Sequence, residues 1–185
     1  MWRTEWQHLE NGLLMTKVCR RVVHDGDAYL VECAVRADGI TSLVADFLDQ
    51  LKEKTWSPES DGTDPIEPDE QLKAYTWLLA KIAYFADEGD FPSIGNRNQL
   101  MNGIWEIKRW HIRITFYDTD GHGSYTPKIT QKIHTGGGGY FPLPDFDPYI
   151  RLGTVFTKTT QKTPHEELDF AEQIRKEDLA HDREH

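Results

Sequence analysis

Apolar and polar positions change their spacing several times along the chain, and each change predicts a different element. Residues 29–35 form a short, mostly apolar and β-favouring run, which predicts a first, central strand. Asp38 and Gly39 end this run. Thr41 or Ser42 can then cap a helix by accepting hydrogen bonds from its free amides. The apolar positions of this helix fall on one face: Leu43, Val44, Phe47, Leu48 and Leu51.

A second helix is predicted over residues 69–87, where apolar side chains again recur at helical spacing and Gly89 follows as a stop signal. The segment that leads into it, residues 57–70, is acidic and contains several prolines. Such a composition buries too little apolar surface to offset the entropy lost on ordering. We therefore expect an acidic mobile loop between the two helices.

The second half of the chain predicts three strands. Residues 104–108 and 112–117 are typical of an antiparallel pair, and residues 149–157 of the last strand. Before this last strand, residues 118–148 form a long insertion rich in Gly and Pro, and loops of this length are usually functional or disordered. Its glycines at 136–139 indicate a flexible hinge, because no Lys-Ser/Thr pair follows them as in a phosphate-binding loop.

A charged C-terminal helix is predicted over residues 165–185, with Pro164 suited to its first turn. The order of the elements predicts an α+β fold with a twisted, antiparallel-rich β-sheet, two helices inserted after the first strand, and a helix at the end. A chain of 185 residues is expected to form one domain, spanning residues 1–185.

Composition indicates a soluble protein, since charged residues make up 28% of the chain and its mean hydropathy is -0.64. No apolar run approaches the ~20 residues that cross a bilayer, and the first residues lack the apolar core of a signal peptide. We therefore expect a cytoplasmic protein that does not enter the membrane. Cys19 and Cys33 are too few for a disulfide framework and are expected to be reduced thiols.

Charge is distributed unevenly along the chain, whose formal net charge is -10. Residues 92–164 hold nine Lys and Arg against five Asp and Glu, a local charge of +4, which leaves -14 for the remainder. A basic face on an acidic body can engage RNA, although its long-range attraction is weaker than that of a wholly basic protein.

The end of the last predicted strand carries the strongest chemical signal. Residues 155–164 begin with the strand-forming pair Val155-Phe156 and continue as a loop of Thr and Gln that contains Lys158 and Lys162. Ammonium groups surrounded by hydroxyl and amide groups are typical of a surface that contacts phosphate or sugar. The competing interpretation is a solvated turn between the last strand and the last helix.

Three strings in strand order make this signal more specific: Glu106-x-Lys108, Arg113-x-x-Phe116, and Thr-Gln-Lys-Thr-Pro at residues 160–164. Together they resemble the RelE/HigB superfamily of type II toxin-antitoxin toxins, in particular its phage-derived HigB-like branch, over residues 25–180. The resemblance implies a compact β-sheet with helices on one side. It further implies a metal-independent, ribosome-associated mRNA endoribonuclease, silenced by a cognate antitoxin that we expect to be a helix-turn-helix protein.

The chain departs from this family in two places. The family crosses the region of residues 118–148 with a short turn, and it has arginine where this chain has Lys108. A lysine cannot make the bidentate contact that arginine makes with phosphate.

Cleavage of RNA without a metal needs a base for the ribose 2′-hydroxyl, a cation for the phosphate, and an acid for the leaving 5′-oxygen. The candidate catalytic residues are Arg113, Lys158, Glu106 and His111. The resemblance assigns the phosphate to Arg113, while His111 is a candidate base because its pKa is ordinarily near neutrality. The candidate RNA-binding residues are Lys108, Arg109, Lys162, Thr160 and Gln161.

Structural interpretations compete with each of these roles. Arg113 can pair with Glu106, Glu106 can pair with Lys108 two residues along the same strand, and His111 can be an ordinary turn histidine. The sequence predicts no metal site and no cofactor, since the calcium-like start at Asp118 has Ile129 where a bidentate Glu is required. Two functional alternatives also stay open: a non-catalytic module that holds a protein partner, and a structural accessory protein of a phage.

Overall fold

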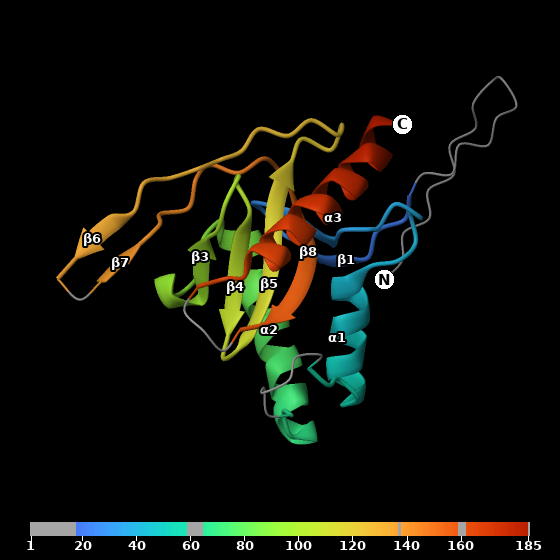
Figure 1. Cartoon of the computed structure of the whole chain (residues 1–185), viewed down its shortest axis with the longest axis vertical. Coiled ribbons are helices and arrows are strands. Elements are labelled where there is room, and N and C mark those ends of the chain that lie inside the picture. The colour runs from blue at the N-terminus through green and yellow to red at the C-terminus, as the bar shows by residue number, and fades with distance from the viewer. Residues whose placement is uncertain (1–17, 59–64, 137, 159–161, 185) are drawn as a thin grey trace, which may run out of the picture.

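The computed structural model describes residues 18–58, 65–136, 138–158 and 162–184, and it has an α+β architecture (Figure 1). The helices are α1 (Leu43–Glu53), α2 (Pro68–Glu88) and α3 (His165–Arg183), with a 3₁₀ turn, η1, at Ile94–Asn96. The strands are β1 (Val22–Asp25), β2 (Leu30–Cys33), β3 (Arg97–Gln99), β4 (Trp105–Arg109), β5 (Ile112–Thr119), β6 (Ile133–Thr135), β7 (Gly138–Tyr140) and β8 (Tyr149–Thr157).

Within these residues, the main sheet has six strands in the order β1-β2-β8-β5-β4-β3. Only the pairing of β2 with β8 is parallel, and the other four ladders are antiparallel. The antiparallel-rich sheet predicted from the sequence is therefore present as a mixed sheet. The strand predicted as the first is the second, since β1 precedes it and pairs with it at one edge.

One face of the sheet packs against α1 and α2. Alternate strand residues point to this face and join the apolar side chains of both helices in one core. Its centre is aromatic: the rings of Phe116 and Phe85 have centroids 5.6 Å apart, and those of Trp105 and Phe146 lie 5.8 Å apart, edge to face. Burial of these large side chains is the main stabilising contribution on this side.

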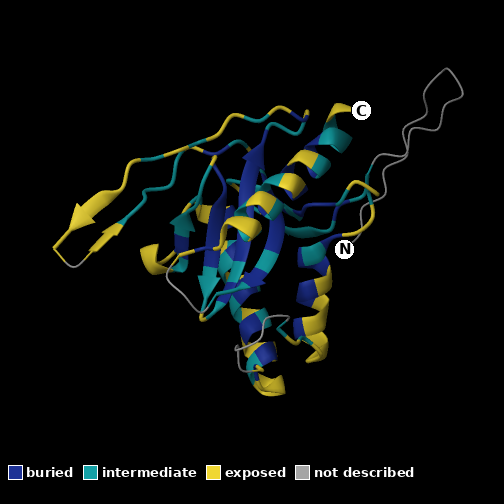
Figure 2. Cartoon of the chain, in the orientation of Figure 1, coloured by how far each residue is buried: buried dark blue, intermediate teal, exposed yellow. Residues whose placement is uncertain are grey.

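The other face of the sheet packs against α3, so the expectation of helices on one side is wrong for the third helix. Figure 1 shows α3 running obliquely across the strands, and Figure 2 shows the buried strand centres beneath it. A small apolar cluster lies at this contact, with Ala34 and Tyr117 from the sheet side and Ile174 and Leu179 from α3. This cluster has far fewer residues than the core under α1 and α2, and polar contacts also hold α3 to the sheet.

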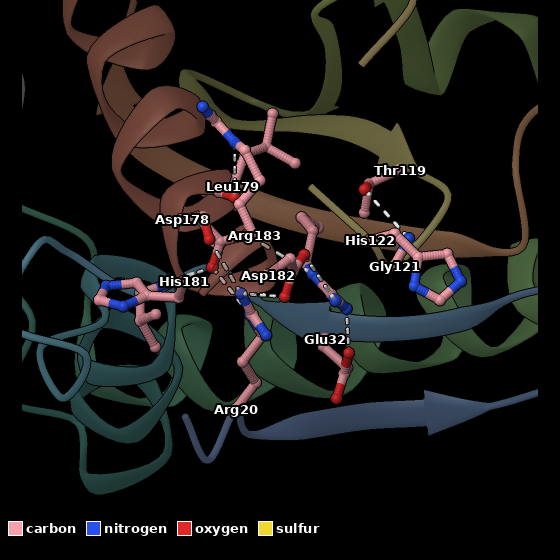
Figure 3. Close-up of polar contacts among 12 residues, drawn as sticks. Arg20, Glu32, Thr119, Gly121, His122, Asp178, Leu179, His181, Asp182 and Arg183 are labelled. Carbon is pink, nitrogen blue, oxygen red and sulfur yellow. Dashed lines mark hydrogen bonds and ion pairs between the residues drawn. The ribbon is translucent and has the colours of Figure 1, made fainter. Parts of the chain in front are cut away.

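These polar contacts centre on Asp178 of α3, which is fully buried (Figure 3). Its carboxylate accepts hydrogen bonds from Arg20 Nε at 2.8 Å, from the Val35 amide at 2.9 Å and from the Tyr117 hydroxyl at 2.9 Å. Arg151 of β8 adds contacts to Glu32, Asp178 and Asp182. The helix is therefore tied to the sheet by paired charges, each of which needs its partner.

The first two helices agree with the sequence prediction. α2 ends at Glu88, and Gly89 follows with φ of 74° and donates its amide to the Phe85 carbonyl, which is the predicted helix stop. Ser42 occupies the N-cap of α1, but its side chain makes no capping hydrogen bond. Part of the acidic segment 57–70 is helical, because α2 begins at Pro68, and residues 59–64 lie outside the described residues.

The long insertion begins two residues later than predicted, because β5 continues to Thr119. Its tip is the hairpin of β6 and β7, which extends away from the main sheet (Figure 1). Gly138 and Gly139 belong to β7, and Gly137 lies outside the described residues. The base of the insertion is fixed to the body by Thr130, whose amide donates to Gln99 Oε1 at 2.7 Å. The insertion is therefore an arm with its own secondary structure.

Candidate functional site

Charged side chains gather where the β4–β5 hairpin and the end of β8 meet, on the face that α3 packs against. Lys108 lies opposite Arg113 in the β4–β5 register, and Glu106 lies opposite Thr115 two pairs further along. Since alternate residues of a strand share a face, Glu106, Lys108 and Arg113 all point to the side away from α1 and α2. The sequence prediction had placed these three residues at one site, and they are neighbours.

Arg113 is held by contacts on two of its three nitrogens. Its Nη1 donates to the carbonyl oxygens of Trp110 at 2.7 Å and Ile112 at 2.8 Å, and its Nε lies 3.6 Å from Glu106 Oε2. Its Nη2 makes no hydrogen bond within the described part of the chain. The guanidinium is therefore fixed in orientation and keeps one edge for an anion.

Glu106 is almost completely buried, with 1% of its surface exposed. Asn98 of β3 donates to Glu106 Oε1 at 3.2 Å, and Arg113 provides the nearby positive charge. A buried carboxylate is stable only with such partners. Of the two ion pairs raised from the sequence, the one between Glu106 and Arg113 is present and orients the arginine. An ion pair between Glu106 and Lys108 is not found in the described part of the chain.

Lys158 follows the last residue of β8 and faces the same cluster. Its amide donates to the His111 carbonyl at 2.7 Å, which fixes the strand end against the β4–β5 turn. Its Nζ donates to Thr163 Oγ1 at 2.9 Å, across the loop that contains the Thr-Gln-Lys-Thr-Pro string. The ammonium group is thus positioned by a neutral hydroxyl, and it forms no ion pair with a carboxylate among the residues that the structure describes.

Burial changes the acid-base properties of Lys108 and Arg113. Burial lowers the pKa of Lys108 from its ordinary value, the charges of Arg113 and Lys158 lower it further, and Glu106 opposes them. Burial likewise lowers the pKa of the Arg113 guanidinium, against the effect of Glu106. The cluster therefore gains stability from any anion that enters it. An amine with a lowered pKa can also exchange protons at a lower pH than an ordinary lysine does.

Two predicted site residues lie on the opposite side of the sheet. The Arg109 guanidinium lies over the Trp77 ring of α2, 4.8 Å from its centroid, and the His111 ring stacks on Trp56 with 6.5 Å between centroids. The structure therefore does not bring Arg109 and His111 together with Arg113. Lys162 is exposed beyond the strand end, and Thr160 and Gln161 lie outside the described residues.

Sequence reasoning missed Asn98 and Thr163, which position Glu106 and Lys158. Thr163 belongs to the string that carried the resemblance, so its position beside Lys158 offered a signal. Asn98 offered no such signal, because β3 contains no apolar residue whose spacing would predict a strand. Its position beside Glu106 follows only from the pairing of β3 with β4.

No family model matches this chain, and neither the curated proteins nor the solved structures include a match. Among the described residues, no group of three or more His, Cys, Asp or Glu side chains is placed to hold a metal ion. The helices of that same part of the chain are all too short or too polar to cross a membrane.

Proposed function

We propose that the chain is a toxin of the RelE/HigB type, a metal-independent endoribonuclease that cleaves mRNA on the ribosome and is silenced by an antitoxin. The observation that carries the proposal is the convergence of Lys108, Arg113 and Lys158 on one end of one sheet face. Lys108 and Arg113 lie on β4 and β5, and Lys158 follows β8 directly, just before the third family-like string. Two helices between the early and later strands, and a terminal helix, also agree with the order that the resemblance implies.

In this proposal Arg113 binds the scissile phosphate through its Nη2 edge, and Glu106 keeps the guanidinium in that orientation. Lys108 is the base that accepts the proton of the ribose 2′-hydroxyl, a role favoured by burial and by its cationic neighbours, which lower the pKa of its amine. The 2′-oxygen attacks phosphorus, the bond to the 5′-oxygen breaks, and Lys158 supplies a proton to that oxygen. The products are a 2′,3′-cyclic phosphate and a 5′-hydroxyl.

The experiment is induced expression of the wild type and of Arg113→Ala, followed by growth curves and by the size distribution of cellular mRNA. Wild type should arrest growth and shorten mRNA, and Arg113→Ala should do neither while its circular dichroism spectrum stays that of the wild type. Arg183→Ala, at the far end of α3, is the matched control and should behave as wild type. Arrest by Arg113→Ala equal to that by wild type would remove Arg113 from the mechanism.

A partner that silences the toxin is expected at the same cluster. An acidic segment would be attracted to the local +4 of residues 92–164 and repelled by the -14 of the remainder. Bound antitoxin should therefore protect the amides of β4, β5 and β8 from hydrogen exchange. Protection confined to α1 and α2 would show that inhibition acts from a distance.

A second candidate is a non-catalytic module that holds a protein partner. The arm favours it, because the β6–β7 hairpin extends from the body and displays Ile133, which is 43% exposed, and Ile129 at the base of the arm is 62% exposed. Exposed aliphatic side chains on a projecting hairpin are suited to a protein interface. Normal growth and intact mRNA on induction of the wild type would favour this candidate over the toxin.

A further inference from the structure

The β4–β5 turn contains a tryptophan in a conformation that its side chain does not favour. Trp110 has a φ of 49°, in the left-handed region that suits glycine, and 46% of its surface is exposed. A two-residue turn between antiparallel strands needs this φ at its first position, and glycine or asparagine is the usual choice. An exposed tryptophan in this strained conformation adds little to the core, so core packing does not explain why a tryptophan occupies this turn.

The indole of Trp110 is held in place by Arg109. The Arg109 guanidinium lies 4.0 Å from the centroid of the Trp110 ring and 4.8 Å from that of Trp77, so the arginine is stacked between two indoles. Lys81 lies over the Trp77 ring as well, 5.6 Å from its centroid. One side of the Trp110 indole is thus fixed by a cation, and the ring keeps a large exposed area. A ring fixed in advance loses little entropy when a second flat group stacks on it.

The turn also borders the cationic cluster. The carbonyl oxygen of Trp110 accepts the hydrogen bond from Arg113 Nη1 at 2.7 Å, and the next residue, His111, accepts from the Lys158 amide. The proposed phosphate-binding groups and the exposed indole are therefore parts of one hairpin end. The indole lies with Arg109 on the α2 side of the hairpin, so a strand of RNA that places a phosphate at Arg113 would pass around the hairpin end to bring the base of a neighbouring nucleotide to Trp110.

We propose that Trp110, oriented by Arg109, is a stacking subsite for one unpaired nucleobase next to the scissile phosphate. The inference rests on the proposed function and adds a residue that selects unpaired RNA by the flat face of a base. The surrounding charges favour nucleic acid over a protein partner as the occupant, since Arg109 on one side of this hairpin end and Lys108 and Arg113 on the other are all cations. A purine should bind better than a pyrimidine, because its larger ring system covers more of the indole.

The test measures binding of a dye-labelled single-stranded RNA of about ten nucleotides, with 2′-O-methyl riboses that prevent cleavage, by fluorescence anisotropy. Trp110→Ala should lower the affinity roughly tenfold and leave its salt dependence unchanged, because no charge is lost. Trp110→Phe should keep most of the affinity. Trp110→Gly should bind as weakly as Trp110→Ala although glycine relieves the positive φ, which separates lost stacking from lost folding.

An abasic scan locates the base. One abasic position should weaken binding to the wild type and have no further effect on Trp110→Ala, as expected when both changes remove the same contact. Equal affinities for wild type, Trp110→Ala and Trp110→Gly would overturn the stacking subsite. That outcome would leave the toxin proposal standing, whereas failure of the wild type to bind or cleave any RNA would remove the basis of both.

Discussion

The two faces of the six-stranded sheet are built from alternate residues of the same strands, yet they are stabilised in different ways. Under α1 and α2, Ile107, Ile114 and Phe116 are all at most 1% exposed and pack against other apolar groups. On the α3 face, Glu106 and Thr115 are equally buried, but each depends on a polar partner. Apolar contact is non-directional and tolerates small shifts, whereas a buried charge depends on one particular group.

This difference separates the roles of the two faces. The face under α1 and α2 stabilises the fold mainly through buried apolar side chains. The α3 face must keep charges in fixed positions, and it is there that Lys108 and Arg113 come together at the end of the hairpin. The same alternation that forms the core therefore positions the candidate site.

The largest expected effect is on the apolar face. Phe116→Ala should lower the free energy of unfolding by about 4 kcal/mol, because it removes a fully buried ring that contacts Phe85, Phe91 and Phe146. Phe116→Leu, which keeps most of the volume, should cost much less. Urea denaturation measures both variants, and equal losses would mean that packing at this position is loose.

A slightly smaller effect is expected from the polar contacts beneath α3. Asp178→Asn should lower the free energy of unfolding by about 3 kcal/mol, because Arg20 and Arg151 lose a shared buried counter-charge. Asp169→Asn, an exposed aspartate on the same helix, is the control and should change little. If the two variants unfold at the same urea concentration, the buried ion pairs do not hold α3 to the sheet.

The next prediction concerns binding. Lys158→Ala combined with Lys162→Ala should weaken RNA binding. The slope of the logarithm of the binding constant against the logarithm of the salt concentration should become shallower by about 1.4, the value for two contacts to single-stranded phosphate. Lys52→Ala combined with Lys73→Ala, on α1 and α2, removes the same charge from the opposite side and should leave the slope unchanged. Equal slopes in the two double variants would contradict a phosphate-facing loop at the end of β8.

The smallest expected effect is a pH dependence. The pKa of Lys108 is lower in the folded protein than its ordinary 10.5, so the unfolded chain binds more protons in the interval between the two values. The contribution of Lys108 to stability is therefore unfavourable at neutral pH and is relieved as the pH rises toward 10.5. Lys108→Met should be more stable than wild type at neutral pH, and this advantage should shrink as the pH rises. A constant difference across that range would show that Lys108 is not buried among cations.

Much of the fold could be predicted because the spacing of apolar residues within each element is regular and can be recognised locally in the sequence. The apolar spacing of α1 and α2, the stop at Gly89 and the whole of β8 appear where the sequence placed them. Two edge strands could not be found this way. β1 is four residues long, and β3 is three polar residues, so both form only because a neighbouring strand offers hydrogen bonds.

The candidate site was predictable in part for the same reason. A two-residue turn fixes the register of β4 and β5, so Lys108 and Arg113 had to be neighbours. The strict alternation along β4 also implies that Arg109 points away from Lys108, so the sequence itself contains the signal that separates these two side chains. The position of α3 could not be anticipated, since it depends on Asp178 meeting Arg20 and Arg151 from distant parts of the chain.

The parallel pairing of β2 with β8 has a consequence for synthesis on the ribosome. β2 needs β8 as its inner neighbour, and Leu30 pairs with Tyr149, so the sheet cannot close until β8 has emerged from the ribosome. Contacts between residues so distant in sequence slow folding, because a long loop must be ordered first. Until then, β1 and β2 are an isolated hairpin and the β4–β5 pair lacks its central partner. A nascent chain of this protein is therefore expected to remain without its charged cluster until β8 and Lys158 have been synthesised and have emerged.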